Sequence, residues 1–239
     1  MYSENFTLSE NTNCSVKDGW NRHESALTHF STFNTVNSSY WLQHEKDSTQ
    51  FFSALSQGTL ESVTWYRPSQ NEDYGFSNND PSAGAKFIDS FFSTVQASSL
   101  WQQNKLAVFV TFSDANGMFD HVPPYMGDRF GPGVRVPAFM VSPFHMRSLG
   151  GNSSVNSQPY EHYSWFKMLA RRFGIGQSAL QSMWGNTRYT AALDLTTSFP
   201  LAAPGQAPTY SNTNGAAQTA QFMEFVVAAV VLVCGLLLL

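Results

Sequence analysis

Cysteine and charged residues are both scarce in this sequence of 239 residues. The two cysteines are Cys14 and Cys234, and the second lies in an apolar run at the C-terminal end, so we expect no disulfide framework. Charged residues make up 13% of the chain, the net charge is -4, and Lys and Arg form no cluster. Binding a nucleic-acid backbone takes clustered Lys and Arg, which excludes nucleic acid as a partner.

The first residues also lack an export signal, because residues 1–16 contain no basic stretch followed by an apolar one. The composition nevertheless favours a protein outside the cytosol, since neutral polar residues rather than charges supply the solubility. Acceptor motifs for N-linked glycans begin at Asn5, Asn13, Asn37 and Asn152. We therefore expect a secreted glycoprotein whose N-terminal part is missing from this sequence.

One long apolar run is present, at residues 225–239, and no Lys or Arg follows it. The run is shorter than the roughly 20 residues that span a bilayer. A polar spacer separates it from the small residues Asn214, Gly215 and Ala216, an order typical of a GPI-attachment signal. A tail-anchored helix and a buried C-terminal helix are the alternatives. The first two interpretations predict membrane attachment through this tail, at the extracellular face of the cell surface.

The order of helical and strand patterns along the chain predicts an α/β fold. Residues 105–112 form a continuous apolar run, which is typical of a strand buried on both faces of a parallel sheet. We expect a central, mostly parallel sheet flanked by helices. The predicted strands are 60–68, 105–112 and 134–143, the predicted helices are 48–57, 84–100 and 160–173, and residues 69–84 are a long loop.

Two of these helices have predicted ends. Ser48 is a suitable N-cap for the helix 48–57, which Gly58 ends. Gly174 ends the helix 160–173. The apolar stripe that we expect to face the sheet from this second helix consists of Tyr163, Phe166, Leu169 and Phe173.

Changes in composition divide the chain into four parts. Residues 1–49 are an irregular N-terminal segment, and residues 50–198 are the α/β domain. Residues 199–224 are rich in Pro, Ala, Gly and Ser, which predicts a flexible stalk. Residues 225–239 are the hydrophobic anchor or GPI signal.

Polar side chains gather directly after the strand 105–112, and ligands bind beyond such strand ends in open parallel sheets. Carboxylates and imidazoles gathered there can hold a divalent cation that polarises a phosphoryl oxygen. The alternative is a turn in which Asp114 and Asn116 hydrogen-bond to their own backbone. His162 lies on the polar side of its helix, where a solvated histidine is the default. The residues after the strand are Ser113, Asp114, Asn116, Asp120 and His121.

Three stretches between residues 105 and 175 share one order with a known family. They read VFVTFSDANGMFDHVPP, GDRFGPGVRVPAFMVSP and YEHYSWFKMLARRFG. In this order they resemble the phosphoesterase family that contains bacterial phospholipases C and acid phosphatases. The resemblance implies the C-terminal part of an alkaline-phosphatase-like fold, incomplete here. It is looser over residues 50–104 and does not place residues 1–49.

The resemblance also implies roles for individual residues. Ser113-Asp114 stands where the family has an Asp-Glu pair for its metal, so one carboxylate is lost and the other is shortened. We therefore expect a divalent metal ion to bind more weakly than in the family. The implied catalytic residues are His121 and His162, the implied metal ligands are Asp114 and Ser113, and the implied supporting residues are Asp120, Asn116 and Arg135.

Two functions remain open at this point. The first is a hydrolase of phosphate ester bonds, of the phospholipase C or acid phosphatase type, whose partner is a phosphate ester or a phospholipid head group. The second is a catalytically inactive surface protein that retains the fold for binding or display.

Overall fold

The computed structural model describes residues 2–3, 27, 30–33, 38–68, 81–115, 119–125, 132–143, 155–184, 191–195, 209–211, 217–219 and 226–229. The chain divides into two compact units. Unit 1 comprises Met1–Asp120, Arg135–Pro143 and Phe225–Leu239, and unit 2 comprises His121–Val134 and Phe144–Glu224.

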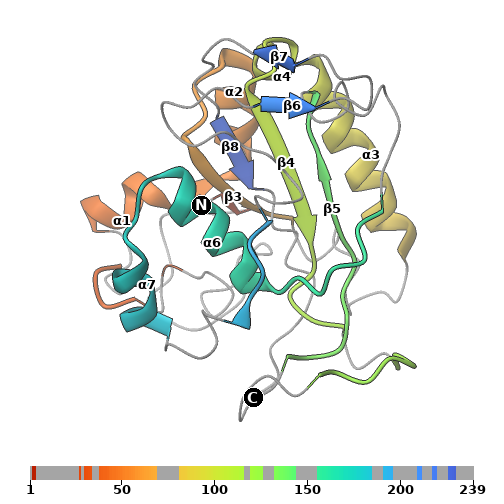
Figure 1. The fold of residues 1–239 in the computed structure, drawn as a ribbon. Helices are drawn as coiled ribbons and strands as arrows, with labels where there is room; N and C mark the ends of the chain where they lie inside the picture. The colour runs from red at the N-terminus through yellow and green to blue at the C-terminus, as the bar shows by residue number, and fades with distance from the viewer. Residues whose placement is uncertain are drawn as a thin grey trace. The chain divides into compact units, whose positions relative to one another are not determined.

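The strands of unit 1 form a six-stranded sheet in the order β2-β1-β3-β8-β4-β5. Four of its pairs, β1–β2, β1–β3, β3–β8 and β4–β8, are parallel, and β4–β5 is antiparallel. Figure 1 labels β3, β8, β4 and β5. The strands are β1 (Tyr2–Ser3), β2 (Lys46–Asp47), β3 (Val63–Arg67), β4 (Leu106–Thr111), β5 (Ala138–Val141) and β8 (Val226–Ala229).

Helices complete unit 1, which confirms the prediction of mixed helix and strand. Their bounds are α1 (Ser39–His44), α2 (Ser48–Gln57), α3 (Pro81–Ala97) and α4 (Ser99–Gln102). The predicted C-terminal end of the loop 69–84 is wrong, because α3 already begins at Pro81. The rest of the predicted loop, residues 69–80, lies outside the described residues. The side chain of Ser98 caps α4 and separates it from α3, where the sequence predicted one helix.

The helix α2 has the predicted bounds, but its N-cap is Asp47 and not Ser48. The Asp47 carboxylate accepts a hydrogen bond from the backbone N–H of Thr49 at 2.8 Å, as an N-cap residue does. Ser48 is buried instead. At the other end, Gly58 has φ +71, so the predicted stop is confirmed.

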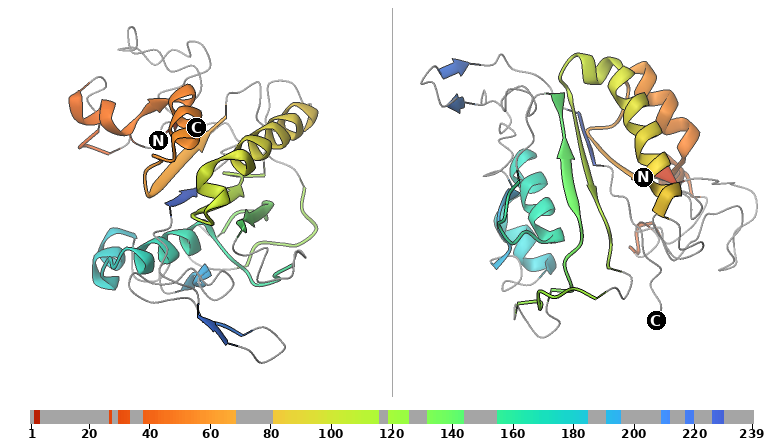
Figure 2. Two further views of the ribbon diagram at one scale, coloured as in Figure 1. Left: turned by 90° about the horizontal axis from the view of Figure 1, so that it is seen from above. Right: turned by 90° about the vertical axis from the view of Figure 1, so that its right-hand side faces the viewer.

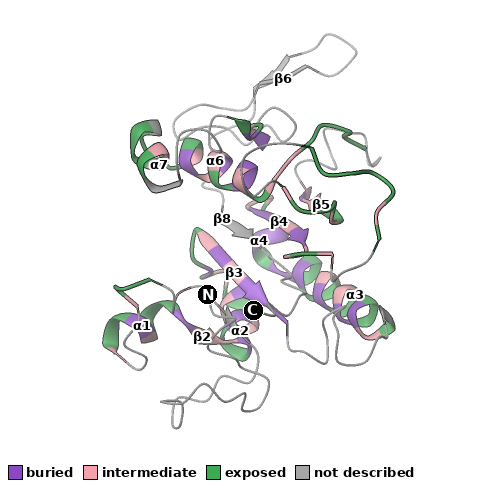
Figure 3. Ribbon diagram, turned by 90° about the horizontal axis from the view of Figure 1, so that it is seen from below, coloured by how far each residue is buried: buried purple, intermediate pink, exposed green. Residues whose placement is uncertain are grey.

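An aromatic core holds α2 and α3 against the same face of β3 and β4 (Figure 2). The ring of Phe51 lies 4.8 Å from the ring of Tyr66 and 5.7 Å from that of Phe91, between centroids. Phe51 and Tyr66 are both 0% exposed. Figure 3 shows β3 and β4 largely buried, while α3 keeps an exposed side. The core therefore fixes the position of these two strands.

The described residues of unit 2 include the helices α6 (His162–Arg172) and α7 (Gln177–Trp184), and a hairpin of β6 (Thr209–Ser211) with β7 (Ala217–Thr219). The hairpin lies within the segment predicted as a stalk. Gly174 has φ +67 just after α6, as its predicted role as a stop requires. Among the described residues, no helix is both long and apolar enough to cross a membrane.

The predicted apolar stripe of α6 is wrong. Phe166 is 36% exposed and Phe173 is 42% exposed, whereas Trp165 is 3% and Met168 is 1% exposed. Apolar residues occupy two neighbouring stripes of this helix, so periodicity alone cannot choose the buried one. The stripe with Trp165 and Met168 is the one that tertiary packing selects.

The aromatic core predicts a large effect of truncating Phe51. Phe51→Ala should lower the free energy of unfolding by about 3–5 kcal/mol, because it removes a fully buried ring and leaves a cavity. Urea denaturation followed by circular dichroism measures this loss. Phe30 is 56% exposed, and Phe30→Ala is the matched control, with an expected change of at most about 0.5 kcal/mol. Equal losses in the two variants would contradict the aromatic core.

The position of β8 gives a second prediction. Val227 is in register with Val63 of β3 and with Ala107 of β4, so β8 has a neighbour on each side. Val227→Pro removes a ladder N–H and should destabilise unit 1 by about 1–3 kcal/mol. The midpoint of thermal unfolding measures this loss of stability. Val155→Pro is the control, because Val155 is 95% exposed and lies outside any helix or strand. An unchanged midpoint for Val227→Pro would show that residues 226–229 do not stabilise the sheet.

Candidate functional site

The strand β4 ends in a polar segment. Thr111 is buried at the end of the strand, Ser113 is half-buried, and Asp114 is exposed. The Ser113 hydroxyl donates a hydrogen bond to Asp114 Oδ2 at 2.9 Å. The structure thus presents a carboxylate, with a hydroxyl beside it, just beyond the carboxyl end of a buried strand. In this kind of sheet that is the usual place for a ligand.

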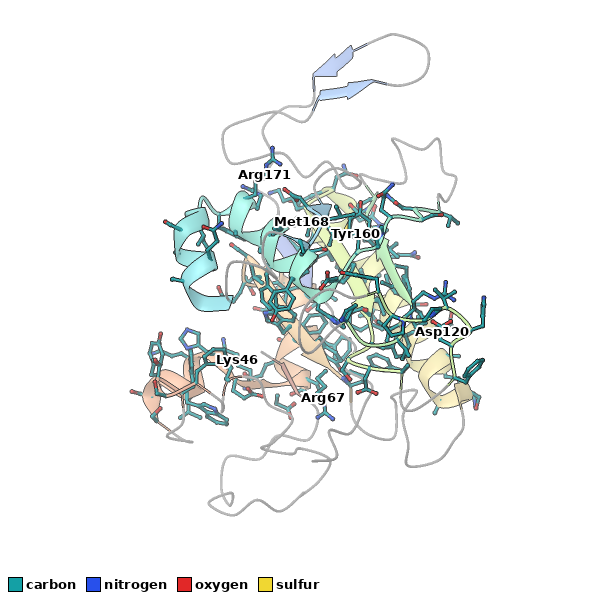
Figure 4. All side chains as sticks on the ribbon, turned by 60° about the horizontal axis from the view of Figure 1, so that its bottom comes forward. Lys46, Arg67, Asp120, Tyr160, Met168 and Arg171 are labelled. Carbon is teal, nitrogen blue, oxygen red and sulfur yellow. The ribbon has the colours of Figure 1, made fainter. Side chains whose placement is uncertain are left out.

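A second charged side chain lies at the same edge of the sheet. Since Val227 pairs with Val63 on one side and with Ala107 on the other, β3 and β4 run in the same direction, and the same offset places Arg67 level with Thr111. With one strand between them, the two strand ends are roughly 10 Å apart. Arg67 is only 5% exposed (Figure 4 labels it). A buried cation therefore lies near the polar end of β4.

Sequence reasoning missed Arg67. The available signal was its place before Pro68, at the end of the predicted strand 60–68. A charged residue in the last position of a buried strand is uncommon, because burial of a charge costs free energy unless the charge is paired. Periodicity gives Arg67 no role, because it identifies strands and does not identify which strand ends are neighbours.

Asp120 and Arg135 form an ion pair that closes the connection between β4 and β5. Arg135 Nε donates to Asp120 Oδ2 and Arg135 Nη2 donates to Asp120 Oδ1, both at 2.8 Å. The hydrogen bond with Asp120 raises the pKa of Arg135. The Asp120 side chain is 13% exposed and that of Arg135 is 62% exposed, so the carboxylate is the more buried partner.

A hydrogen bond joins the same two strands close to this ion pair. The Thr111 hydroxyl donates to the carbonyl oxygen of Pro137 at 3.2 Å. Beyond it, Thr111 pairs with Ala138 in the antiparallel ladder of β4 and β5. The segment that carries Ser113 and Asp114 therefore leaves the sheet at a fixed point.

In unit 2, a contact joins the segments that carry the two predicted catalytic histidines. The Tyr125 hydroxyl donates a hydrogen bond to Glu161 Oε1. Tyr125 follows His121 by four positions, and Glu161 is the N-cap of α6, directly before His162. Both histidines are exposed. Sequence reasoning missed Tyr125 and Glu161, because only the fold brings their segments together.

The structure describes most of the predicted site residues, within two units. Ser113 contacts Asp114, and Asp120 contacts Arg135, in unit 1. His121 and His162 belong to unit 2. Asn116 lies outside the described residues. It stays a prediction that the two histidines and Asp114 converge on one pocket.

The donor set among the described residues does not fit a resident metal ion. In this part of the chain, no three His, Cys, Asp or Glu side chains lie close enough together to hold one. Asp114 has a hydroxyl beside it rather than a second carboxylate, and both carboxylate oxygens of Asp120 accept hydrogen bonds from Arg135. Hard divalent cations take several oxygen ligands, so a single accessible carboxylate is a weak site.

The chain belongs to the Phosphoesterase family, whose model matches residues 1–176. This result confirms the resemblance found in the sequence. It also extends the resemblance to residues 1–49, which the three motif stretches did not place.

Among particular relatives, the chain is similar to the non-hemolytic phospholipase C of Pseudomonas aeruginosa. The two are 28% identical over 162 residues, which covers 54% of this chain and 22% of that protein. The chain is also 27% identical over 199 residues to non-specific phospholipase C6 of Arabidopsis thaliana, covering 71% of this chain and 36% of the relative. The chain thus spans about a fifth to a third of the length of these relatives. No solved structure matches it significantly.

Proposed function

We propose that this chain is part of a phosphoesterase that hydrolyses phosphate esters, with phospholipid head groups as the substrate class. The similar proteins described above are phospholipases C, which supports this class. The observation that carries the proposal is the polar end of β4. There Ser113 and Asp114 follow a buried strand, within the region that the family model matches.

We also propose that unit 1 is the core of a mostly parallel, alkaline-phosphatase-like sheet that is incomplete in this chain. The parallel pairs β1–β3, β3–β8 and β4–β8 support this architecture. So does the burial of β4, of whose six residues only Phe109 is not fully buried.

Hydrolysis of a phosphate ester breaks the bond between phosphorus and the leaving oxygen and adds the elements of water. A carboxylate such as Asp114 can accept a proton from the attacking water, and an imidazole such as that of His121 or His162 can donate a proton to the leaving oxygen. The positive charge of Arg67 lies at the same sheet edge as Asp114 and offsets the negative charge of the phosphate. We propose that a divalent cation binds only weakly at Asp114, so none of these steps depends on one.

The proposed setting is the extracellular face of the cell surface. The scarcity of charge, the four sequons and the apolar run 225–239 support a secreted glycoprotein attached to the membrane by its C-terminal tail, in the manner of a GPI signal. Residues 226–229 of this tail form β8 in the sheet, so processing of the tail as a GPI signal would remove this strand from unit 1.

The proposal predicts that the full chain hydrolyses p-nitrophenyl phosphate or p-nitrophenyl phosphorylcholine, and that Asp114→Ala lowers kcat by at least about a hundredfold. The rate of nitrophenolate release, with and without added Mg²⁺ or Zn²⁺, measures this hydrolysis in the wild-type chain and in the variant. Asp89→Ala is the matched control, because Asp89 is an exposed carboxylate on α3, and it should leave the rate unchanged.

No release of nitrophenolate by the wild-type chain under any of these conditions would refute the hydrolase. The alternative, an inactive surface protein that retains the fold for binding or display, would then be supported. Equal losses in Asp114→Ala and Asp89→Ala would show that Asp114 has no special role.

A further inference from the structure

Exposed apolar side chains and arginines gather at the C-terminal end of α6, within unit 2. Phe173 is 42% exposed, Ile175 is 50% exposed and Leu193 is 37% exposed. Arg171, in the last turn of α6, has a side chain that is 64% exposed. Figure 4 labels Arg171 and, on the buried stripe of the same helix, Met168. The helix-end patch consists of Arg171, Arg172, Phe173, Ile175 and Leu193.

Hydrogen bonds hold the backbone at this end of the helix. The Phe173 N–H donates to the Leu169 carbonyl at 2.9 Å, and the Ile175 N–H donates to the Ala170 carbonyl at 2.8 Å. Gly174 between them has φ +67, which completes a common type of helix ending. In this ending the residue after the glycine often packs on the helix, yet half of Ile175 is exposed. The ending therefore holds an apolar side chain at the surface.

Two polar contacts hold the segment with Leu193 beside α6. The amine of Lys167 donates to the carbonyl oxygen of Ala192. Arg171 Nη1 donates to Asp194 Oδ2 at 3.1 Å. Lys167 and Arg171 are four positions apart, so both contacts lie on the same side of the helix. Leu193, between the two contacted residues, is thus held near Arg171.

Positive charge is concentrated at the same end of α6. This helix contains three Lys and Arg residues and no Asp or Glu, in a chain whose net charge is -4. Among the described residues of unit 2, the acidic side chains are Glu161, before the opposite end of α6, and Asp194, which pairs with Arg171. The guanidinium carbon of Arg172 lies 5.8 Å from the ring centroid of Phe173. Cationic and apolar groups therefore adjoin each other in the patch.

This combination fits a phospholipid surface better than a protein surface. A stable protein interface takes about 20–30 residues on each side, far more than the patch offers. A bilayer takes only a few aromatic or aliphatic side chains, which enter at the level of the head groups, together with cations that attract the lipid phosphates. Arginine suits the second task, because its planar guanidinium binds phosphate oxygens in pairs.

We propose that the helix-end patch is a docking surface for a phospholipid bilayer. Phe173, Ile175 and Leu193 lie at the level of the head groups, and Arg171 and Arg172 bind lipid phosphates. This docking is additional to the attachment proposed for the C-terminal tail, and it does not depend on hydrolysis. For the proposed hydrolase, it brings unit 2 to the surface that contains the substrate.

A fluorescent label measures docking at the patch itself. In the full chain with Cys14→Ser and Cys234→Ser, Ile175→Cys carries a nitrobenzoxadiazole label, and vesicles of equal parts phosphatidylcholine and phosphatidylglycerol are added. The emission should rise about two- to threefold and shift to shorter wavelength, because the label enters the head-group region. Val155→Cys is the matched control, because Val155 is also in unit 2, is 95% exposed and lies outside any helix. Its label should not change.

A charge variant tests the arginines. In the chain labelled at residue 175, Arg171→Gln/Arg172→Gln should raise the lipid concentration for half of the emission change by about tenfold, because each cation near a charged surface strengthens binding. Lys86→Gln is the control, since Lys86 is an exposed cation on α3, and it should leave that concentration unchanged. Circular dichroism checks that each variant is folded.

Three outcomes would overturn the docking surface. The first is an Ile175→Cys label that does not respond to vesicles, which is also the result expected if the tail alone attaches the chain. The second is an equal response of the labels at residues 155 and 175. The third is a response at residue 175 to protein concentration without vesicles, which would assign the patch to contact between two copies of the chain. An inactive wild-type chain would refute the hydrolase alone, since these measurements need no turnover.

Discussion

The packing of α2 and α3 against β3 and β4 is the interaction on which the rest of unit 1 depends. Phe51, Tyr66 and Phe91 fill the space between these helices and the sheet, and burial of such rings is the largest favourable term available to a chain with so few charges. β3 and β4 end at one level because Val63 and Ala107 both pair with Val227 of β8, and this register places Arg67 level with Thr111.

The residues beyond those strand ends are held by polar contacts rather than by burial. The Asp120–Arg135 ion pair and the Thr111–Pro137 hydrogen bond fix the connection between β4 and β5, and a capped helix start receives Tyr125. Polar contacts of this kind impose direction as well as distance, which apolar packing does not. Within unit 1, a stable apolar core thus supports directed polar contacts at the end of β4, where Ser113 and Asp114 lie.

Local sequence patterns predicted the elements well and their relations poorly. The bounds of α2, the burial of β4 and the stops at Gly58 and Gly174 follow from neighbouring residues, and the structure agrees with each of them. The pairing of Asp120 with Arg135 and of Tyr125 with Glu161 depends on segments that are distant in sequence, which periodicity does not report. The wrong stripe on α6 has the same cause, since two apolar stripes competed and only tertiary contacts chose between them.

The candidate site was predicted in part for a related reason. The family motifs identified Asp114, His121 and His162 as residue types in an order, and each lies in an exposed position where a ligand can reach it. Arg67 belongs to no motif and was found only through strand register. A motif identifies residues by their order in the sequence, whereas a side chain outside the motifs is found only from its place in the fold.

The place of β8 bears on how the chain folds during synthesis. β3 and β4 are made early, yet the strand that joins them comes from far downstream in the chain. Contacts between such distant residues form slowly, because the entropy cost of closing a long loop comes before the favourable free energy of the contacts. Until then, β3 and β4 each keep an unpaired edge, and such edges pair readily with other chains. A nascent chain of this protein is therefore expected to need a chaperone until β8 has been made.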